Sequence, residues 1–265
     1  MNSIWINAPA KINIGLDVLR RREDGYHEVK MIMQSIRLFD RLTLTKSDKP
    51  GIRLTTNLRF LPVNEDNLVY RSAKLLMDEY KLEGGLDIQL DKRIPVAAGM
   101  AGGSTDAASC MLALNDLYEL GLSKRQLMKR GVRLGADIPY CILKGTALSE
   151  GIGEKISTIP KMPDCYVLIC KPGIHVSTGF VYTNLVLDEN TPHPDIDYMI
   201  TCMKKKDLKT LCQNLGNVLE TVTIPAHPEI AKIKETMMQE GALGSLMSCL
   251  LYTSPSHETP EHLVC

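Results

Sequence analysis

A glycine-rich segment at residues 94–108 carries the first residues whose types and spacing could do chemistry. It reads IPVAAGMAGGSTDAA and runs directly into an apolar helical pattern. Backbone N–H groups at the start of a helix form an anion site, and glycines let the chain approach a phosphate closely. The hydroxyls of Ser104 and Thr105 could bond phosphate oxygens or a metal ion. The segment contains neither the Walker A pattern nor G-x-G-x-x-G, so a helix entry that binds no ligand stays open as an alternative.

Lys11 and Asp137 are the candidate partners of this phosphate loop. Taken alone, Lys11 on the polar side of a strand is more typical of a solvated charge, and Asp137 of a turn or helix cap. Phosphoryl transfer needs a base for the attacking hydroxyl, which a carboxylate can supply. An ammonium nearby would keep that carboxylate ionised and stabilise the developing alkoxide. Spacing alone does not show that the two residues meet.

Alternating and helical patterns predict the elements that position these residues. Apolar residues with a period of two predict strands at residues 12–18 and 86–90, and a continuous apolar run predicts another at residues 165–170. In the first of these strands, Lys11 and Asn13 fall on the face opposite the aliphatic residues.

Three helices are predicted around the same loop. Asp66 or Asn67 caps the first, over residues 68–80. The second contains residues 107–118, with Ala107, Met111, Leu114 and Tyr118 on one face. The third opens with the capping box Ser123-x-x-Gln126 and continues through Leu134.

Composition restricts the partners and the compartment. The 265 residues hold 31 basic and 31 acidic side chains, so the formal net charge is zero. That balance argues against a nucleic-acid partner and against a polybasic membrane patch. Eight cysteines without a C-x-x-C pair are typical of buried thiols in a reducing compartment. With neither a secretory leader nor an apolar run of about 18 residues, the cytoplasm is expected, for a monomer or a homodimer.

Several separate motifs resemble those of the GHMP small-molecule kinases, in the same order along the chain. A finer resemblance, to members that act on a cytidine-diphosphate-linked substrate, rests on three further segments. The resemblance runs from about Ser3 to Ser248. The family motifs are Ala8–Asn13, Pro95–Ala108 and Gly135–Pro139, and the finer ones are Asp24–Glu28, Glu65–Leu68 and Asp91–Pro95.

The resemblance implies an α+β fold with two domains. Residues 1–160 would form the N-terminal, ATP-binding domain, a mixed sheet like that of ribosomal protein S5 domain 2 with helices on one face. Residues 161–248 would form a smaller C-terminal α+β sandwich, incomplete here. The implied activity is ATP-dependent phosphorylation of the 2-hydroxyl of cytidine-diphosphate-linked methylerythritol, in the non-mevalonate route to isoprenoid precursors, with Mg2+ accompanying ATP.

The same resemblance assigns roles to individual residues. Asp137 matches the catalytic base and Lys11 its partner. Tyr26 and His27 match the pair that holds the cytidine end, Asn13 a substrate-contacting residue, and Thr178 and Tyr182 a further wall of that site, while no protein residue is assigned to a metal. The residues matched to ATP are Pro95, Val96, Ala97, Ala98, Gly99, Met100, Ala101, Gly102, Gly103, Ser104 and Thr105 of the loop, together with Asn67 and Lys92.

The last 17 residues, 249–265, depart from the family pattern. They show no period of 2 or 3.6 and no glycine, where the family continues with a small-residue loop, a strand and a helix. We interpret them as foreign or frame-shifted sequence, a change expected to impair the enzyme. Two alternatives stay open: another GHMP kinase with a different acceptor, and a GHMP-like protein that binds ATP without turnover.

Overall fold

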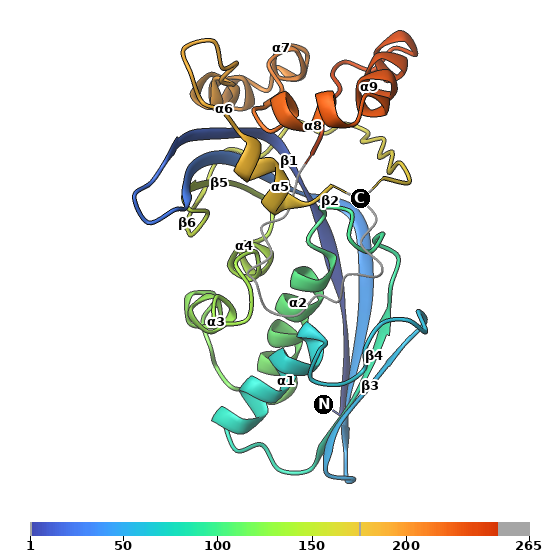
Figure 1. Ribbon diagram of the computed structural model, residues 1–265. Coiled ribbons are helices and arrows are strands. Elements are labelled where there is room, and N and C mark those ends of the chain that lie inside the picture. Colours follow the sequence, from blue (N-terminus) through green and yellow to red (C-terminus); the bar gives the residue numbers. More distant parts are fainter. Residues whose placement is uncertain (1, 175, 249–265) are drawn as a thin grey trace. The chain divides into compact units, whose positions relative to one another are not determined.

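The computed structural model describes residues 2–174 and 176–248 and divides the chain into two compact units (Figure 1). Unit 1 contains residues 1–11 and 36–144, and unit 2 contains residues 12–35 and 145–265. The long strands β1 (Ser3–Arg21) and β2 (His27–Ser47) contribute to both. The units therefore do not follow the predicted ranges 1–160 and 161–248. The interpretation of residues 249–265 lies outside the described residues.

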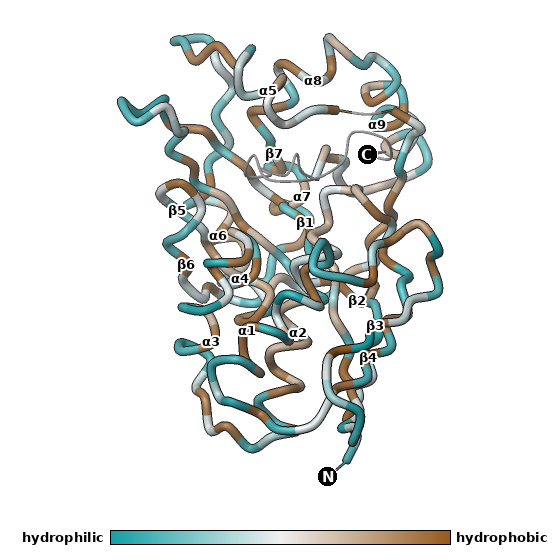
Figure 2. The backbone as a smooth tube through the Cα atoms, turned by 60° about the horizontal axis from the view of Figure 1, so that its bottom comes forward, coloured by the Kyte–Doolittle hydropathy of each residue, from teal (hydrophilic) through white to brown (hydrophobic). Residues whose placement is uncertain are grey.

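The sheet of unit 1 is mixed, as predicted. Its order is β3-β4-β2-β1, where β3 is Gly51–Thr56 and β4 is Gly85–Asp91. Strands β3 and β4 are parallel, whereas β2 and β4 are antiparallel. Leu86, Ile88 and Leu90 of β4 are buried between more exposed polar neighbours. Figure 2 colours the backbone by hydropathy and shows brown, hydrophobic positions interleaved with teal, hydrophilic ones along the chain. One face of this sheet is therefore apolar and needs a cover.

Helices α1 to α4 supply that cover on one face of the unit 1 sheet (Figure 1). Helix α2 packs against α1 and α4, and nearly all of its residues from Thr105 to Leu114 are buried. The predicted class, an α+β fold with helices on one face of a mixed sheet, is confirmed. The helices are α1 (Leu68–Glu79), α2 (Gly102–Leu117), α3 (Lys124–Gly131) and α4 (Ile138–Leu143).

The predicted helix starts are also confirmed. The side chain of Asn67 accepts a hydrogen bond from the backbone N–H of Val69 at 2.9 Å, which caps α1. Ser123 and Gln126 form both halves of the capping box at α3. Helix α3 ends at Gly131 rather than at the predicted Leu134, and a tight turn leads into α4.

Unit 2 combines the remaining strands and helices around its own apolar core. Strand β5 pairs antiparallel with β2 and with β6, and β7 pairs parallel with β1. Leu16, Val29, Val181 and Val218 belong to the buried cluster at its centre. The elements are β5 (Thr146–Gly151), β6 (Lys155–Thr158), β7 (Gly216–Asn217), α5 (Thr178–Asn184), α6 (Ile196–Lys205), α7 (Leu208–Gln213), α8 (Glu220–Ala226) and α9 (Glu229–Gln239).

The strand predicted at residues 165–170 is wrong. These residues are not assigned to a strand, and none of the described residues forms a ladder with them. Their apolar side chains are exposed, 105% for Tyr166 and 77% for Leu168. A run of apolar and β-branched residues favours an extended backbone, but only a neighbouring strand can supply the ladder hydrogen bonds. Within the described residues, none of the helices has the length and apolar character that crossing a bilayer requires.

Candidate active site

The phosphate loop of unit 1 joins β4 to α2 through an unusual backbone. Ala97, Gly99 and Ala101 all have positive φ, at 53°, 67° and 54°. Only glycine adopts this left-handed region without steric cost, so the two alanines are held there by their surroundings. Left-handed residues within a turn direct successive N–H groups into a concavity that suits anions. The predicted loop therefore has the backbone of a phosphate-binding segment at the N-terminus of α2.

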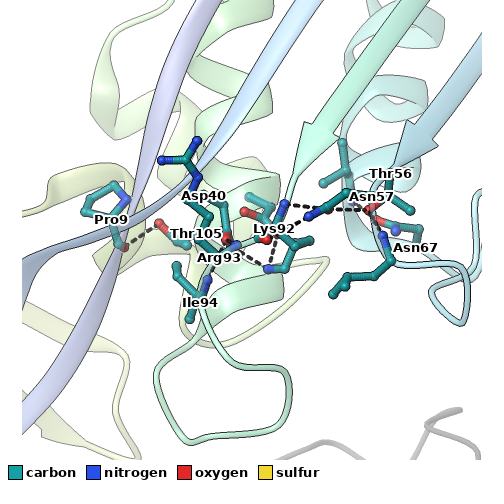
Figure 3. A network of polar contacts seen from close by, with 12 residues as sticks. Pro9, Asp40, Thr56, Asn57, Asn67, Lys92, Arg93, Ile94 and Thr105 are labelled. Atoms are coloured by element: carbon teal, nitrogen blue, oxygen red, sulfur yellow. Dashed lines mark hydrogen bonds and ion pairs between the residues drawn. The ribbon is translucent and has the colours of Figure 1, made fainter. Parts of the chain in front are cut away.

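Two contacts hold this loop against β1. The backbone N–H of Lys11 donates to the carbonyl of Met100 at 3.1 Å, and the Thr105 hydroxyl donates to the carbonyl of Pro9 at 2.8 Å (Figure 3). The first hydrogen bond joins β1 to the loop, and the second joins β1 to the first turn of α2. The motif that carries Lys11 thus lies directly beside the phosphate loop.

The turn that carries Asp137 lies beside the same loop. A Cβ placed on Gly135 would lie 4.0 Å from the hydroxyl oxygen of Ser104. Asp137 is half-buried and immediately precedes α4, and its side chain makes no cap hydrogen bond to that helix. Its carboxylate is therefore not a helix cap, the role that the residue type alone would favour at this position.

The buried thiol of Cys141 feels the charges of both Lys11 and Asp137. Burial raises the pKa of this thiol, the Asp137 carboxylate raises it further, and the Lys11 ammonium lowers it. Thr105 also lowers it through a side-chain hydrogen bond. Both charged groups therefore lie within electrostatic reach of one sulfur atom, next to the first turn of α2. Lys11 itself is only 2% exposed, so it is not a solvated strand lysine.

Two residues predicted to lie beside the nucleotide are held by protein contacts. The side chain of Asn67 caps α1 through its oxygen, and its amide nitrogen donates to the carbonyl of Pro62 at 2.8 Å. The ammonium of Lys92 is buried between the carboxylates of Asp40 and Asp106. Sequence reasoning missed both carboxylates. Asp106 stands within the phosphate-loop motif and could have been noticed, whereas Asp40 belongs to no motif.

The residues predicted to hold the cytidine end lie in unit 2, where two of them meet. The rings of His27 and Tyr182 have centroids 4.9 Å apart and are tilted by 38°. Burial lowers the pKa of His27, and Arg21 lowers it further. Tyr26 stays 42% exposed at the end of the turn that contains Asp24 and Gly25. A neutral imidazole and an exposed phenol ring are suited to hydrogen bonding and stacking with a base.

Asn13 and Thr178 complete the predicted substrate residues. Asn13 is 2% exposed, and its backbone N–H donates to the hydroxyl of Ser248 at 3.0 Å. Thr178 is the first residue of α5, a helix capped by Ser177, while the Thr178 side chain lies outside what the structure describes. Tyr182 lies on the same helix, one turn later.

The described residues offer little protein-based ligation for a metal. Among them, no three or more His, Cys, Asp or Glu side chains are grouped so that they could hold an ion. Asp40 and Asp106 are already paired with Lys92, which leaves the Ser104 hydroxyl and the Asp137 carboxylate beside the loop. Such a set fits a magnesium ion that is carried mainly by nucleotide phosphates and water.

Comparison with known proteins shows the family and the fold of this chain. Residues 67–145 match the family described as GHMP kinases N terminal domain, and residues 199–249 match GHMP kinases C terminal. A solved crystal structure of 4-(cytidine 5'-diphospho)-2C-methyl-D-erythritol kinase superposes with a TM-score of 0.76 at 30% identity, over 90% of this chain and 84% of that chain. The mevalonate kinase of L. major, in complex with R-mevalonate, superposes with a TM-score of 0.70 at 18% identity, covering 92% and 83% of the two chains, a likeness that shows the fold alone.

Curated relatives are more similar still. The 4-diphosphocytidyl-2-C-methyl-D-erythritol kinase of Lachnoclostridium phytofermentans is 54% identical over 248 residues, which cover 94% of this chain and 85% of the relative. The protein of the same name from Geobacillus sp. is 48% identical over 245 residues, covering 92% and 84%. With this identity over most of both chains, and with GHMP kinase matches in both halves, the chain belongs to the 4-diphosphocytidyl-2-C-methyl-D-erythritol kinase family of GHMP kinases.

Proposed function

We propose that this chain transfers the γ-phosphoryl group of ATP to the 2-hydroxyl of 4-diphosphocytidyl-2-C-methyl-D-erythritol, a step toward isoprenoid precursors. The observation that carries the proposal is that the segments of Lys11 and Asp137 both lie beside the phosphate loop. The Lys11 N–H donates to the Met100 carbonyl, and Gly135 lies against Ser104. The names of its relatives support the acceptor. The buried thiols Cys110, Cys141 and Cys202 support a reducing compartment such as the cytoplasm.

In the proposed reaction, the phosphate loop holds the triphosphate through its backbone N–H groups. The acceptor oxygen forms a bond to the γ-phosphorus while the bond from that phosphorus to the bridging oxygen breaks, and ADP leaves. The hydroxyl proton moves to the Asp137 carboxylate. The Lys11 ammonium stabilises the developing negative charge on the acceptor oxygen. Positioning and charge neutralisation account for most of the catalysis in such transfers.

Magnesium is proposed to arrive with ATP. The ion would neutralise part of the triphosphate charge, with the Ser104 hydroxyl as the candidate protein ligand. Ser104 is suited to this because it stands half-buried at the junction of the loop and α2. The Thr105 hydroxyl is instead donated to the carbonyl of Pro9.

Tyr26 and His27 are proposed to hold the cytidine end of the acceptor, with Tyr182 and Thr178 as a further wall of the substrate site. Asn13 is proposed to contact the acceptor near the end that receives the phosphoryl group. The ring contact between His27 and Tyr182 supports this assignment because it places two ring systems together at one point of unit 2. An imidazole that stays neutral has one nitrogen to donate and one to accept, which matches the mixed donor and acceptor edge of cytosine.

The test is an ADP-release assay with Mg2+, ATP and three acceptors in parallel. Turnover with the cytidylyl substrate, and none with homoserine or mevalonate, supports the proposal. Turnover with either of the other acceptors would assign the chain to another GHMP activity. A melting temperature raised by Mg-ATP together with no turnover on any acceptor would instead identify an inactive nucleotide-binding protein. Asp137→Asn serves as the matched catalytic control in every arm.

A further inference from the structure

The Lys92 side chain occupies a position that the proposed function does not explain. Its ammonium lies 2.5 Å from Asp40 Oδ2 (Figure 3) and 2.7 Å from Asp106 Oδ2. All three side chains are nearly inaccessible to solvent. Asp40 belongs to β2, Lys92 follows β4, and Asp106 belongs to the first turns of α2. One ammonium therefore joins three elements of unit 1.

The backbone around Lys92 is held as firmly as its side chain. The second oxygen of the Asp40 carboxylate accepts hydrogen bonds from the N–H groups of Arg93 and Ile94, at 2.5 and 2.8 Å. The Asn57 side chain accepts from the Lys92 N–H at 2.8 Å and donates to the Lys92 carbonyl at 3.0 Å. The three residues that lead into the phosphate loop are thus hydrogen-bonded to side chains from two neighbouring segments.

The C-terminal end of the loop, where α2 begins, lies close to the same ammonium. A Cβ placed on Gly102, the first residue of α2, would lie 3.1 Å from Lys92 Nζ and 3.4 Å from Ile94 Cγ2. The start of the helix can approach this closely because residue 102 is glycine. Asp106 reaches back from the same helix to the ammonium. Residues 95–101 therefore form a loop whose two ends are joined through one side chain.

This closure matters because the loop has a backbone that it would not keep alone. Ala97 and Ala101 are held at positive φ, which disfavours the observed shape relative to a relaxed loop. Strained residues persist where surrounding contacts over-determine them. The contacts of Lys92 are placed to do this, since they hold both ends of the strained segment at a set separation.

We propose that Lys92 is a positioning residue, which joins the entry and exit of the phosphate loop and so keeps its N–H groups arranged for the triphosphate. The proposal rests on the proposed function in one respect only, that the ligand of the loop is ATP. Lys92 acts through the loop, and its ammonium, held by the side chains of Asp40 and Asp106, is not the group that contacts phosphate. Removing the ammonium is therefore expected to impair ATP binding without changing how the acceptor is held.

The test compares Lys92→Met with Lys74→Met. Lys74 is a matched control because it also faces two carboxylates, Glu65 at 3.7 Å and Asp78 at 3.6 Å, but on the exposed surface of α1. Lys92→Met is expected to raise KM for ATP by about tenfold or more, since misplacing reactant-holding groups by about 1 Å costs up to a hundredfold. KM for the acceptor should stay within about twofold, and Lys74→Met should match the parent protein in both constants.

Hydrogen exchange gives a readout that needs no turnover. Amides of residues 95–105 should exchange faster in Lys92→Met, while the amides of α3 keep their parent rates. A variant with unchanged exchange in the loop and unchanged KM for ATP would overturn the proposal. So would an equal rise in both KM values, because that would indicate general loosening of the fold. Failure of the parent protein to turn over any acceptor would count against the proposed function alone, since ATP affinity and exchange still test Lys92.

Asp106→Ala provides a second test of the proposal if the Lys92→Met protein does not fold. This variant cuts the connection to α2 and leaves Lys92 and Asp40 as a neutral buried pair. It is expected to raise the ATP dissociation constant and loop exchange in the same direction. Asp106→Asn, which keeps an oxygen acceptor for the ammonium, should rescue most of both effects. If the alanine and asparagine variants behave alike, the connection does not position the loop.

Discussion

The rings of His27 and Tyr182 lie 4.9 Å apart between centroids, although one residue opens β2 and the other lies on α5. The contact joins two parts of unit 2 that are far apart in the sequence. Tyr182 also packs against the apolar cluster that contains Val29 and Val181, so its ring is fixed from behind. A base-binding pair needs this kind of support, because a ring that moves freely loses entropy on binding.

Replacing His27 by Ala is expected to raise KM for the cytidylyl substrate by about tenfold, the size of one lost hydrogen bond plus one ring contact. KM for ATP should change little. Steady-state kinetics with each substrate varied in turn checks the split. Tyr182→Phe is the matched control, since it keeps the ring and its packing and removes only the hydroxyl. An unchanged acceptor KM in His27→Ala would remove this residue from the site.

The pH dependence of acceptor binding follows from the lowered pKa of His27. Burial and Arg21 disfavour the imidazolium, so the neutral ring persists as pH falls through the usual histidine value of 6.5. The dissociation constant of the acceptor should therefore stay constant from pH 8 down to about pH 6.5. It should rise only at lower pH, where the imidazole takes up a proton. Calorimetric titration with the cytidylyl substrate, with His27→Ala as the control, measures this. A midpoint at or above 6.5 would mean that a negatively charged neighbour outweighs both burial and Arg21 in setting the pKa of the ring.

Asp137→Asn is expected to lower kcat by about a hundredfold to ten-thousandfold, the range attributed to a positioned general base. The amide keeps the size of the side chain but cannot take the hydroxyl proton. Lys11→Met should also lower kcat, by about a hundredfold, because it removes a charge that stabilises the alkoxide. Single-turnover measurements at saturating ATP and acceptor separate this loss from binding. Retention of the parent kcat by Asp137→Asn would assign the base to another residue.

Much of unit 1 could be predicted from local signals. The caps at Asn67 and Ser123 and the strand over residues 86–90 each depend on a few adjacent residues, and all were confirmed. The phosphate loop was found because it stands directly before an apolar helix. That the segments of Lys11 and Asp137 both lie beside this loop could not be predicted from spacing, since residues far apart in sequence are brought near each other only by the topology of the sheet and α4.

Burial and ion pairing could not be predicted in the same way. The period of two at residues 12–18 shows which side chains share a face, but not what covers that face. In the structure the polar side is covered too, with Lys11, Asn13 and Asp17 all 5% exposed or less. Asp40 gave no signal, since a single acid in a strand is ordinary until its partner is seen. The apolar run at 165–170 was wrongly predicted as a strand. Its composition suits a strand, but none of the described residues pairs with it as a neighbouring strand.

The backbone of the phosphate loop gives a stability prediction. Ala101→Gly should leave the free energy of unfolding within about 0.5 kcal/mol of the parent, because relief of left-handed strain offsets the greater freedom of the unfolded chain. Ala107→Gly, in the right-handed part of α2, should cost about 1 kcal/mol. Ala101→Val should cost more than Ala101→Gly, since a branched side chain fits φ of 54° poorly. Urea denaturation compares the three, and equal losses for both glycine variants would contradict the strain at Ala101.

The buried carboxyl of Asp106 should make the free energy of unfolding depend on pH. Burial raises the pKa of this carboxyl well above its usual value of 3.8, and Asp40 adds to the rise while Lys92 opposes it. Besides these two groups, the thiols of Cys110 on its own helix and Cys141 on α4 feel its charge. The folded chain therefore holds a proton at Asp106 that the unfolded chain releases above about pH 4, and stability falls as pH rises from there to the folded pKa.

Asp106→Asn removes that loss because the amide does not ionise. Its free energy of unfolding relative to the parent should become steadily more favourable from about pH 4 up to the folded pKa of the carboxyl, by at most about 1.4 kcal/mol for each pH unit. Asp87→Asn is the control, since Asp87 is an exposed acid whose pKa is lowered by its hydrogen bond with Arg53. That variant should show no such gain with rising pH. Parallel stability curves for Asp106→Asn and the parent over this range would show that the carboxyl is ionised throughout and that Lys92, rather than burial, governs its charge.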